Sequence, residues 1–152
     1  NYERLKPEVV HIEALVRKKH KATLKLVDGM DGYYEYHSRF DGREWMLNQA
    51  LGCEGIDDGS KGRYLNLLGL TKRDRGAYSA ALELHEQSLA IELKTRGDEH
   101  PSVATSYNNM ANVYNAQART YYDGAYQVYQ KAYGEDHSET IDAKKKRDAC
   151  DE

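Results

Sequence analysis

Apolar residues between positions 102 and 117 recur every three or four positions, which is the spacing of one face of an α-helix. The stripe that we expect to be packed consists of Tyr107, Met110, Ala111 and Tyr114. The neighbouring face carries amides instead, because Asn108, Asn112 and Asn115 follow one another at i, i+4 and i+7. Asparagine is a poor helix former, since its side chain competes for backbone hydrogen bonds. The pattern therefore predicts a helix with one packed face and one face where amides serve another purpose.

The same helical pattern occurs more than once along the chain. Residues 107–132 align with residues 65–90, so that Ala111 corresponds to Gly69, and a weaker copy covers residues 27–51. In each copy a helix leads through a tight turn into a second helix that opens on an aromatic residue, namely Phe40, Tyr78 or Tyr122. We expect the turn of the last copy within "AQARTYYDGA", residues 116–125. Small residues such as Gly69 and Ala81 let two antiparallel helices approach closely, and such pairs bury their apolar faces by stacking.

These repeats predict an all-α fold, a solenoid of about three stacked antiparallel helix pairs. We expect an N-terminal helix leading into the repeats (1–23), a divergent pair (24–57), a pair (58–99), a pair with a shortened second helix (100–137), and a capping helix or the start of a further unit (138–152). His100 and His137 fall in equivalent turns between units, where we expect them to cap or pack locally. The side chains available for packing in the last segment are Ile141, Ala143, Ala149 and Cys150. One further helix face, expected to pack with its phenol groups at the rim, carries Tyr122, Tyr126, Tyr129 and Tyr133.

The string "AALELHEQSLAIELKTRGDEHPSVATSYNNMANVY", residues 80–114, resembles the tetratricopeptide repeat in its 42-residue kinesin-light-chain-like form. The match is good across residues 62–137 and weaker across 24–57, where Arg43 stands at a position at which the family prefers alanine. The resemblance implies a right-handed superhelix whose first helices line a concave groove. It also implies that asparagines along these helices hold the backbone of an extended peptide, since related proteins bind peptides in this way.

The candidate peptide-binding residues lie on the groove-facing side of the first helices. On the later helix they are Asn108, Asn112 and Asn115, and one unit earlier they are Arg63, Asn66 and Arg73. An amide both donates and accepts hydrogen bonds, so a row of amides can hold a peptide backbone whatever its side chains are. The arginines would favour an acidic or phosphorylated motif. A simpler reading is that these polar residues are only solvated and that Asn109 serves the interface between units.

Composition narrows the class of protein. The sequence of 152 residues is 39% hydrophobic and 31% charged, and its net charge is −3, which is not the basic excess of a nucleic-acid binder. Cys53 and Cys150 carry no metal or redox motif, so we expect a reducing, cytoplasmic compartment. No membrane-spanning run is visible. The run "KKKR" at residues 144–147 fits either a solvated helix face or a nuclear-import pattern. The chain opens with Asn1 rather than Met, as a fragment of a longer protein would.

No catalytic motif, metal-ligand spacing or phosphate loop emerges, so we expect a non-catalytic scaffold without cofactors that binds a protein or peptide partner. Two alternatives with the same fold stay open. One is a helical-repeat arm of a larger signalling (STAND-type) ATPase, and the other is an RNA-binding helical repeat. Self-association through an exposed repeat edge is a further expectation.

Overall fold

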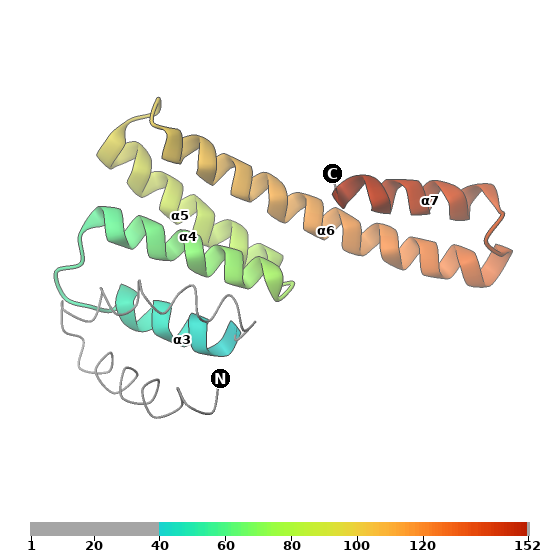
Figure 1. The fold of residues 1–152 in the computed structure, drawn as a ribbon, viewed down its shortest axis with the longest axis horizontal. Helices are drawn as coiled ribbons and strands as arrows, with labels where there is room; N and C mark the ends of the chain where they lie inside the picture. Colours follow the sequence, from blue (N-terminus) through green and yellow to red (C-terminus); the bar gives the residue numbers. More distant parts are fainter. Residues whose placement is uncertain (1–39, 152) are drawn as a thin grey trace, which may run out of the picture.

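The computed structural model describes residues 40–151, and these residues form helices joined by short turns (Figure 1). In chain order the helices are α3 (Phe40–Leu51), α4 (Asp58–Asp74), α5 (Tyr78–Arg96), α6 (Pro101–Tyr133), α7 (Ser138–Asp148) and the short 3-10 helix η1 (Ala149–Asp151). No strand occurs among these described residues, so the predicted all-α fold is confirmed. The helix predicted over residues 1–23 and the first part of the divergent pair lie outside the described residues.

The helix ends follow from local capping chemistry. Asp57 accepts a hydrogen bond from the Ser60 backbone amide at 2.8 Å and so caps α4, and this contact holds the pKa of Asp57 below its ordinary value. His100 caps α6 in the same way, because its Nδ1 accepts from the Ser102 amide. His137 stands at the start of α7, where its ring stacks on Tyr133 at a centroid distance of 4.6 Å. The two histidines thus do the local capping and packing that the repeat pattern predicts.

The core lies where α3, α4 and α5 meet. Its first layer joins α3 to α4 through the buried residues Met46, Leu47, Ala50, Cys53, Tyr64 and Leu68. The second layer joins α4 to α5, where a Cβ added to Gly69 would lie 2.7 Å from Cε1 of His85. Farther along the same pair, Ser88 Oγ donates to the carbonyl oxygen of Gly62 at 2.7 Å. The prediction that small residues allow close helix approach is confirmed at Gly69 and Ala81, both of which are buried.

Helix α6 differs from the sequence prediction. The turn predicted within residues 116–125 is wrong, because Pro101–Tyr133 is one continuous helix of 33 residues. Good helix formers occupy the start of that segment, and Thr120 Oγ1 donates to the Ala116 carbonyl inside the helix. In the predicted pair over 100–137 the second helix therefore continues the first instead of folding back on it.

The continuous course of α6 also changes which of its faces is covered. Its buried residues are Val103, Ser106 and Val113, whereas Tyr107 and Tyr114 are each 56% exposed. Ala111 is exposed and Met110 is half-buried. The prediction that Tyr107, Ala111 and Tyr114 are packed is wrong, because the helix expected to cover them does not return.

Helix α7 packs antiparallel to the C-terminal half of α6 (Figure 1). Its buried residues are Thr140 and Ala143, which correspond to Val103 and Ser106 in the α5–α6 joint. Thr140 was not expected to pack, and Ile141, which was, is 42% exposed. Of the predicted tyrosine face, Tyr122, Tyr126 and Tyr129 are half-buried, whereas Tyr133 is 59% exposed. The joint from α6 to α7 therefore repeats the joint from α5 to α6.

Gly124 offers a direct test of the continuous helix. A Cβ at this position would have no neighbour within 4 Å, and its backbone is helical. We expect Gly124→Ala to raise the free energy of unfolding by about 1 kcal/mol, because alanine is the better residue in an exposed helix interior. Thermal and denaturant unfolding measure the change. A loss of stability would show that residue 124 lies in a turn with the backbone conformation that favours glycine.

Candidate functional site

The centre of the candidate site is the Asn66 side chain on α4. Its Oδ1 accepts hydrogen bonds from His85 Nδ1 on α5 at 2.8 Å and from Asn109 Nδ2 on α6 at 2.9 Å. One half-buried amide oxygen thus connects three helices. Asn66 was predicted to face the groove, and its oxygen instead serves the interface between units. The simpler reading of Asn109 as an interface residue is confirmed.

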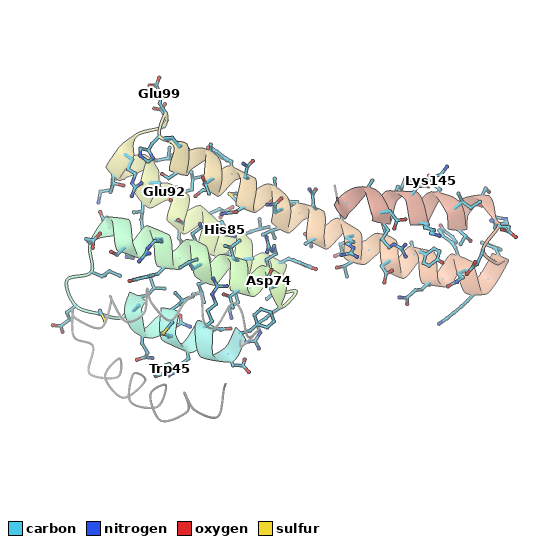
Figure 2. The ribbon with its side chains drawn as sticks, viewed as in Figure 1. Trp45, Asp74, His85, Glu92, Glu99 and Lys145 are labelled. Carbon is cyan, nitrogen blue, oxygen red and sulfur yellow. The ribbon has the colours of Figure 1, made fainter. Side chains whose placement is uncertain are left out.

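His85 lies fully buried on α5, in the stack that α5 forms with α4 and α6 (Figure 2). Because an amide oxygen only accepts, His85 Nδ1 must carry the hydrogen, which leaves Nε2 as the unprotonated nitrogen. Nε2 is buried and has no hydrogen-bond partner among the described residues. Burial, and secondarily the charge of Arg73, lower the pKa of His85 below its ordinary value of 6.5. The ring is therefore a neutral structural group at physiological pH.

This neutral histidine predicts a pH-dependent stability. Below about pH 6.5 an unfolded chain protonates His85 while the folded chain does not, so the free energy of unfolding decreases as the pH falls from about 7.5 to about 5.5. Denaturant unfolding across this range measures the decrease. In His85→Gln, which keeps an amide that can donate to Asn66, we expect the slope to become shallower. An unchanged slope would show that His85 takes up a proton as readily in the folded protein as in the unfolded chain, which would contradict the lowered pKa.

The three predicted asparagines of α6 are all exposed. Asn108 and Asn112 lie on the side of α6 that faces away from its buried residues Val103, Ser106 and Val113. Asn115 lies beside them, closer to the exposed tyrosines. The packed network holds Asn66 and Asn109 in place, whereas Asn108, Asn112 and Asn115 present their amides to solvent.

The two predicted arginines have different surroundings. Arg73 forms an ion pair with Asp74 through Nε at 2.9 Å and Nη2 at 2.7 Å, so its charge is largely balanced. The guanidinium of Arg63 lies over the ring of Tyr64, 5.1 Å from its centroid. Arg63 and Asn66 both line a cavity of about 200 Å³ between α4, α5 and the start of α6, together with Glu92 and Thr105. The lining of this cavity does not include Arg73, Asn108, Asn112 or Asn115, so the structure brings together only part of the predicted set.

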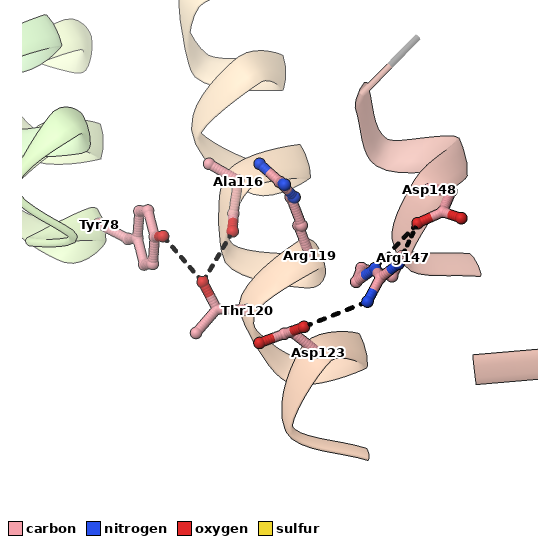
Figure 3. Close-up of a pocket in the computed structure, with 7 residues that line it drawn as sticks. All are labelled: Tyr78, Ala116, Arg119, Thr120, Asp123, Arg147 and Asp148. Atoms are coloured by element: carbon pink, nitrogen blue, oxygen red, sulfur yellow. Dashed lines mark hydrogen bonds and ion pairs between the residues drawn. The ribbon is translucent and has the colours of Figure 1, made fainter. Parts of the chain in front are cut away.

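A larger hollow of about 610 Å³ lies where the first turn of α5, the middle of α6 and the end of α7 meet (Figure 3). Tyr78 Oη lies 2.9 Å from Thr120 Oγ1 across it. Arg147, the last residue of the basic run, is paired with Asp148 at 2.7 Å and with Asp123 at 3.5 Å. Because these aspartates balance the Arg147 charge, that arginine stabilises the contact between α6 and α7.

The polar contacts that join the units were not predicted from the sequence. His85 was not singled out, although it stands one turn after the small residue Ala81 and opposite Gly69, where the repeat places close packing. Ser106 Oγ donates to Glu92 Oε2 at 2.8 Å, which links α6 to α5. A histidine facing a glycine across a predicted pair is the signal that points to this layer.

The described residues show neither a metal-binding cluster nor a membrane-spanning helix. No cluster of three or more histidine, cysteine, aspartate or glutamate side chains is arranged to hold a metal ion within that part of the chain. None of the helices that the structure describes combines the length and the apolar character needed to cross a membrane.

Comparison with known proteins identifies the repeats. The chain matches the tetratricopeptide repeat family twice, over residues 60–119 and over residues 103–139. Together the two matches cover more than half of the 152 residues and include α4, α5 and α6. No curated protein matches the chain. The matched repeats and the stacked helices lead to one conclusion: the chain belongs to the tetratricopeptide repeat family, with repeats of the kinesin-light-chain-like type.

Proposed function

We propose that this chain is a non-catalytic scaffold that binds an extended segment of a partner protein along the exposed amide face of α6 and the neighbouring cavity on α4. Tetratricopeptide repeats generally mediate protein–protein interactions, and this family membership is the basis of the proposal. The single observation that carries the site is the row of solvent-facing amides at Asn108, Asn112 and Asn115 on a rigid helix. A cytoplasmic location, where both free cysteines would stay reduced, is part of the same proposal.

A network of buried and half-buried hydrogen bonds holds the helix that carries this row in place. Asn109 lies between Asn108 and Asn112 in the sequence and is hydrogen-bonded to Asn66, which in turn is hydrogen-bonded to His85. These hydrogen bonds fix the rotation of α6 about its axis, so the exposed amides keep a constant spacing. A peptide backbone bound to such a preorganised row loses less affinity to ordering of the protein.

The charges near the cavity favour an acidic motif. The preference is weaker than the sequence predicts, because the predicted site residues do not all contribute equally. Arg63 lines the cavity on α4 and is exposed, as is Arg96, so both can meet a carboxylate there. Arg73 is already paired with Asp74, so its contribution to the proposed site is smaller. Glu92 lines the same cavity, which makes the surface mixed in charge and limits the preference for acid.

A peptide-display selection tests the proposed function. Random and acid-enriched libraries would be panned against the wild type and against the double variant Asn108→Ala, Asn112→Ala. We expect the wild type to select one extended motif and the double variant to bind that motif at least about tenfold more weakly, the equivalent of losing one or two hydrogen bonds.

The matched control is Asn48→Ala, which removes an exposed amide from α3. Circular dichroism should show equal helicity in all three proteins, because the altered side chains are exposed. Equal affinity of the wild type and the double variant would place the partner elsewhere and refute the amide row as its binding site.

A further inference from the structure

The helix α6 carries an apolar stripe that nothing in the described structure covers. Four side chains spaced seven residues apart point outward along it: Tyr107 is 56% exposed, Tyr114 56%, Tyr121 70% and Val128 64%. Between them, also seven apart, stand the alanines Ala111, Ala118, Ala125 and Ala132, which are exposed or half-buried. Large and small residues thus alternate at spacings of four and three over four heptads, which is the pattern of a coiled-coil seam.

The position of the other helices leaves this stripe open along its whole length. Helix α5 packs on the N-terminal half of α6 and α7 packs on its C-terminal half, on opposite sides in the view of Figure 1. Ser106 of α6 meets α5, Asn109 meets α4, and Asp123 and Tyr126 meet α7. None of these belongs to the stripe. A large exposed apolar seam on a soluble helix marks an interaction surface.

We propose that the stripe is the contact surface of an antiparallel homodimer, in which the α6 helices of two copies pair along Tyr107–Ala132. In an antiparallel pair each large position of one helix meets a small position of the other. Tyr107 then faces Ala132 of the second copy, Ala111 faces Val128, Tyr114 faces Ala125 and Ala118 faces Tyr121. One register satisfies all these pairings, and its twofold axis passes between positions 119 and 120.

The internal repeat gives a register that differs from this one by a single residue. In the α4–α5 pair Gly69 lies against His85. The first helices align Gly69 with Ala111, and the aromatic residues that open the second helices, Tyr78 and Tyr122, align His85 with Tyr129 after a shift of two further residues. Ala111 should then face Tyr129, one position from the Val128 that the heptad pattern gives.

A single copy cannot make this contact while α6 is continuous. Ala111 and Val128 are about 26 Å apart along one helix, at a rise of about 1.5 Å per residue. In a repeat of this kind a second helix packs on the first half of α6. The residues expected to form that second helix instead continue α6 as its second half. In the dimer, the second half of α6 from one copy packs on the first half of α6 from the other. Each copy thus supplies the covering helix that the other lacks.

The residues beside the seam place no like charges opposite each other. On one flank Asn108 meets Tyr129 of the second copy and Asn115 meets Tyr122, pairs in which an amide lies beside a phenol. On the other flank Lys131 meets Met110 and Gln117 meets Gly124. Antiparallel pairing therefore carries no charge penalty along its edges. Asn112 lies on the far side of α6 and stays open, whereas Asn108 and Asn115 lie at the edge of the pair, so the dimer and the proposed peptide site share two amides.

Mixed disulfide cross-linking tests both the dimer and its register. Two variants, Ala111→Cys and Val128→Cys, would be made in a background that carries Cys53→Ala and Cys150→Ser, and would be refolded together and oxidised. We expect a disulfide-linked dimer that contains one chain of each variant, identified by its intact mass. A cross-link of Ala111→Cys to itself would instead indicate a parallel pair and overturn the proposal.

The double variant Ala111→Cys, Val128→Cys separates the dimer from a chain that folds back on itself. Cross-linking within one chain, with none between mixed single variants, would show a closed hairpin and would also overturn the proposal. Sedimentation of the wild type should give twice the chain mass of 17.4 kDa, and a monomer at about 100 µM would refute the dimer.

A charge placed in the seam gives the matched comparison. Ala111→Glu should weaken the dimer at least about 100-fold, because a buried carboxylate without a partner is costly. Ala90→Glu makes the same change at an exposed position of α5 and should leave the dimer unchanged. Since both alanines are exposed within one chain, both variants should keep wild-type helicity, and equal dimer affinity of the two would contradict the seam.

Discussion

Replacing Gly69 with valine should lower the free energy of unfolding by about 3 kcal/mol. Gly69 is buried in the middle of α4, and a Cβ there would come within 2.7–3.0 Å of three atoms of the His85 ring. The ring has little room to move, because it is fully buried and its Nδ1 is bonded to Asn66. The added carbons must therefore push α4 and α5 apart, which loses packing contacts between these two helices.

The control for this prediction is Gly124→Val. The residue is also a helical glycine, but a Cβ there would have no neighbour within 4 Å. The two substitutions change helix propensity equally, so the difference between them isolates the contact with His85. Denaturant unfolding of both variants gives the comparison. Equal and small effects would mean that α4 and α5 do not approach as closely as the structure shows.

Replacing Asn66 with alanine should lower the free energy of unfolding by about 2 kcal/mol relative to a matched exposed asparagine. The change removes the oxygen that accepts from both His85 and Asn109, at 2.8 and 2.9 Å. The donor on the fully buried His85 would then lack a partner inside the stack. A donor stranded in a packed interior costs more than the hydrogen bond itself contributes.

The matched control is Asn112→Ala, the same chemical change at an exposed position of α6. Both substitutions gain the same helix propensity, so Asn112→Ala should be neutral or slightly stabilising. If both variants unfold alike, the hydrogen bonds of Asn66 do not hold the three helices together. A larger loss for Asn66→Ala would support the interface role over a purely solvent-facing one.

Much of the fold could be predicted because its signals are local and repeated. The spacing of Leu65, Leu68 and Gly69 predicts the packed face of α4, and these residues are buried. The recurring turn strings predict the joints at His100 and His137, where α6 and α7 begin. Helical periodicity and capping residues are properties of a few neighbouring positions, so one sequence suffices to find them.

The course of α6 could not be predicted in the same way. A turn within residues 116–125 rests on alignment with the earlier pair, where Gly76 has a positive φ of 75°. The aligned segment in α6 has Gly124, whose backbone stays helical, and alanines that favour the helix. Local propensity and the repeat rule conflict here, and local propensity decides the geometry. The exposure of Tyr107 and Tyr114 follows from that outcome.

The sequence predicted which candidate residues are exposed, but not which of them are bonded to neighbouring side chains. The exposed position of Asn108, Asn112 and Asn115 follows from helical phase, which the pattern of apolar residues supplies. The engagement of Asn66 with His85 and of Arg73 with Asp74 depends on side-chain orientation. Helical phase does not determine how a side chain is oriented. A residue on the expected face can therefore still be hydrogen-bonded to a neighbouring side chain.

Binding of an extended partner along the amide row of α6 can be tested by a nuclear magnetic resonance titration. Protein labelled with nitrogen-15 would be titrated with the peptide motif selected by display, and the side-chain amide signals of the asparagines would be followed. We expect the signals of Asn108 and Asn112 to shift with peptide concentration, along with the backbone signals around Arg63. Shifts confined to α3 or α7, with the signals of Asn108 and Asn112 unmoved, would contradict it.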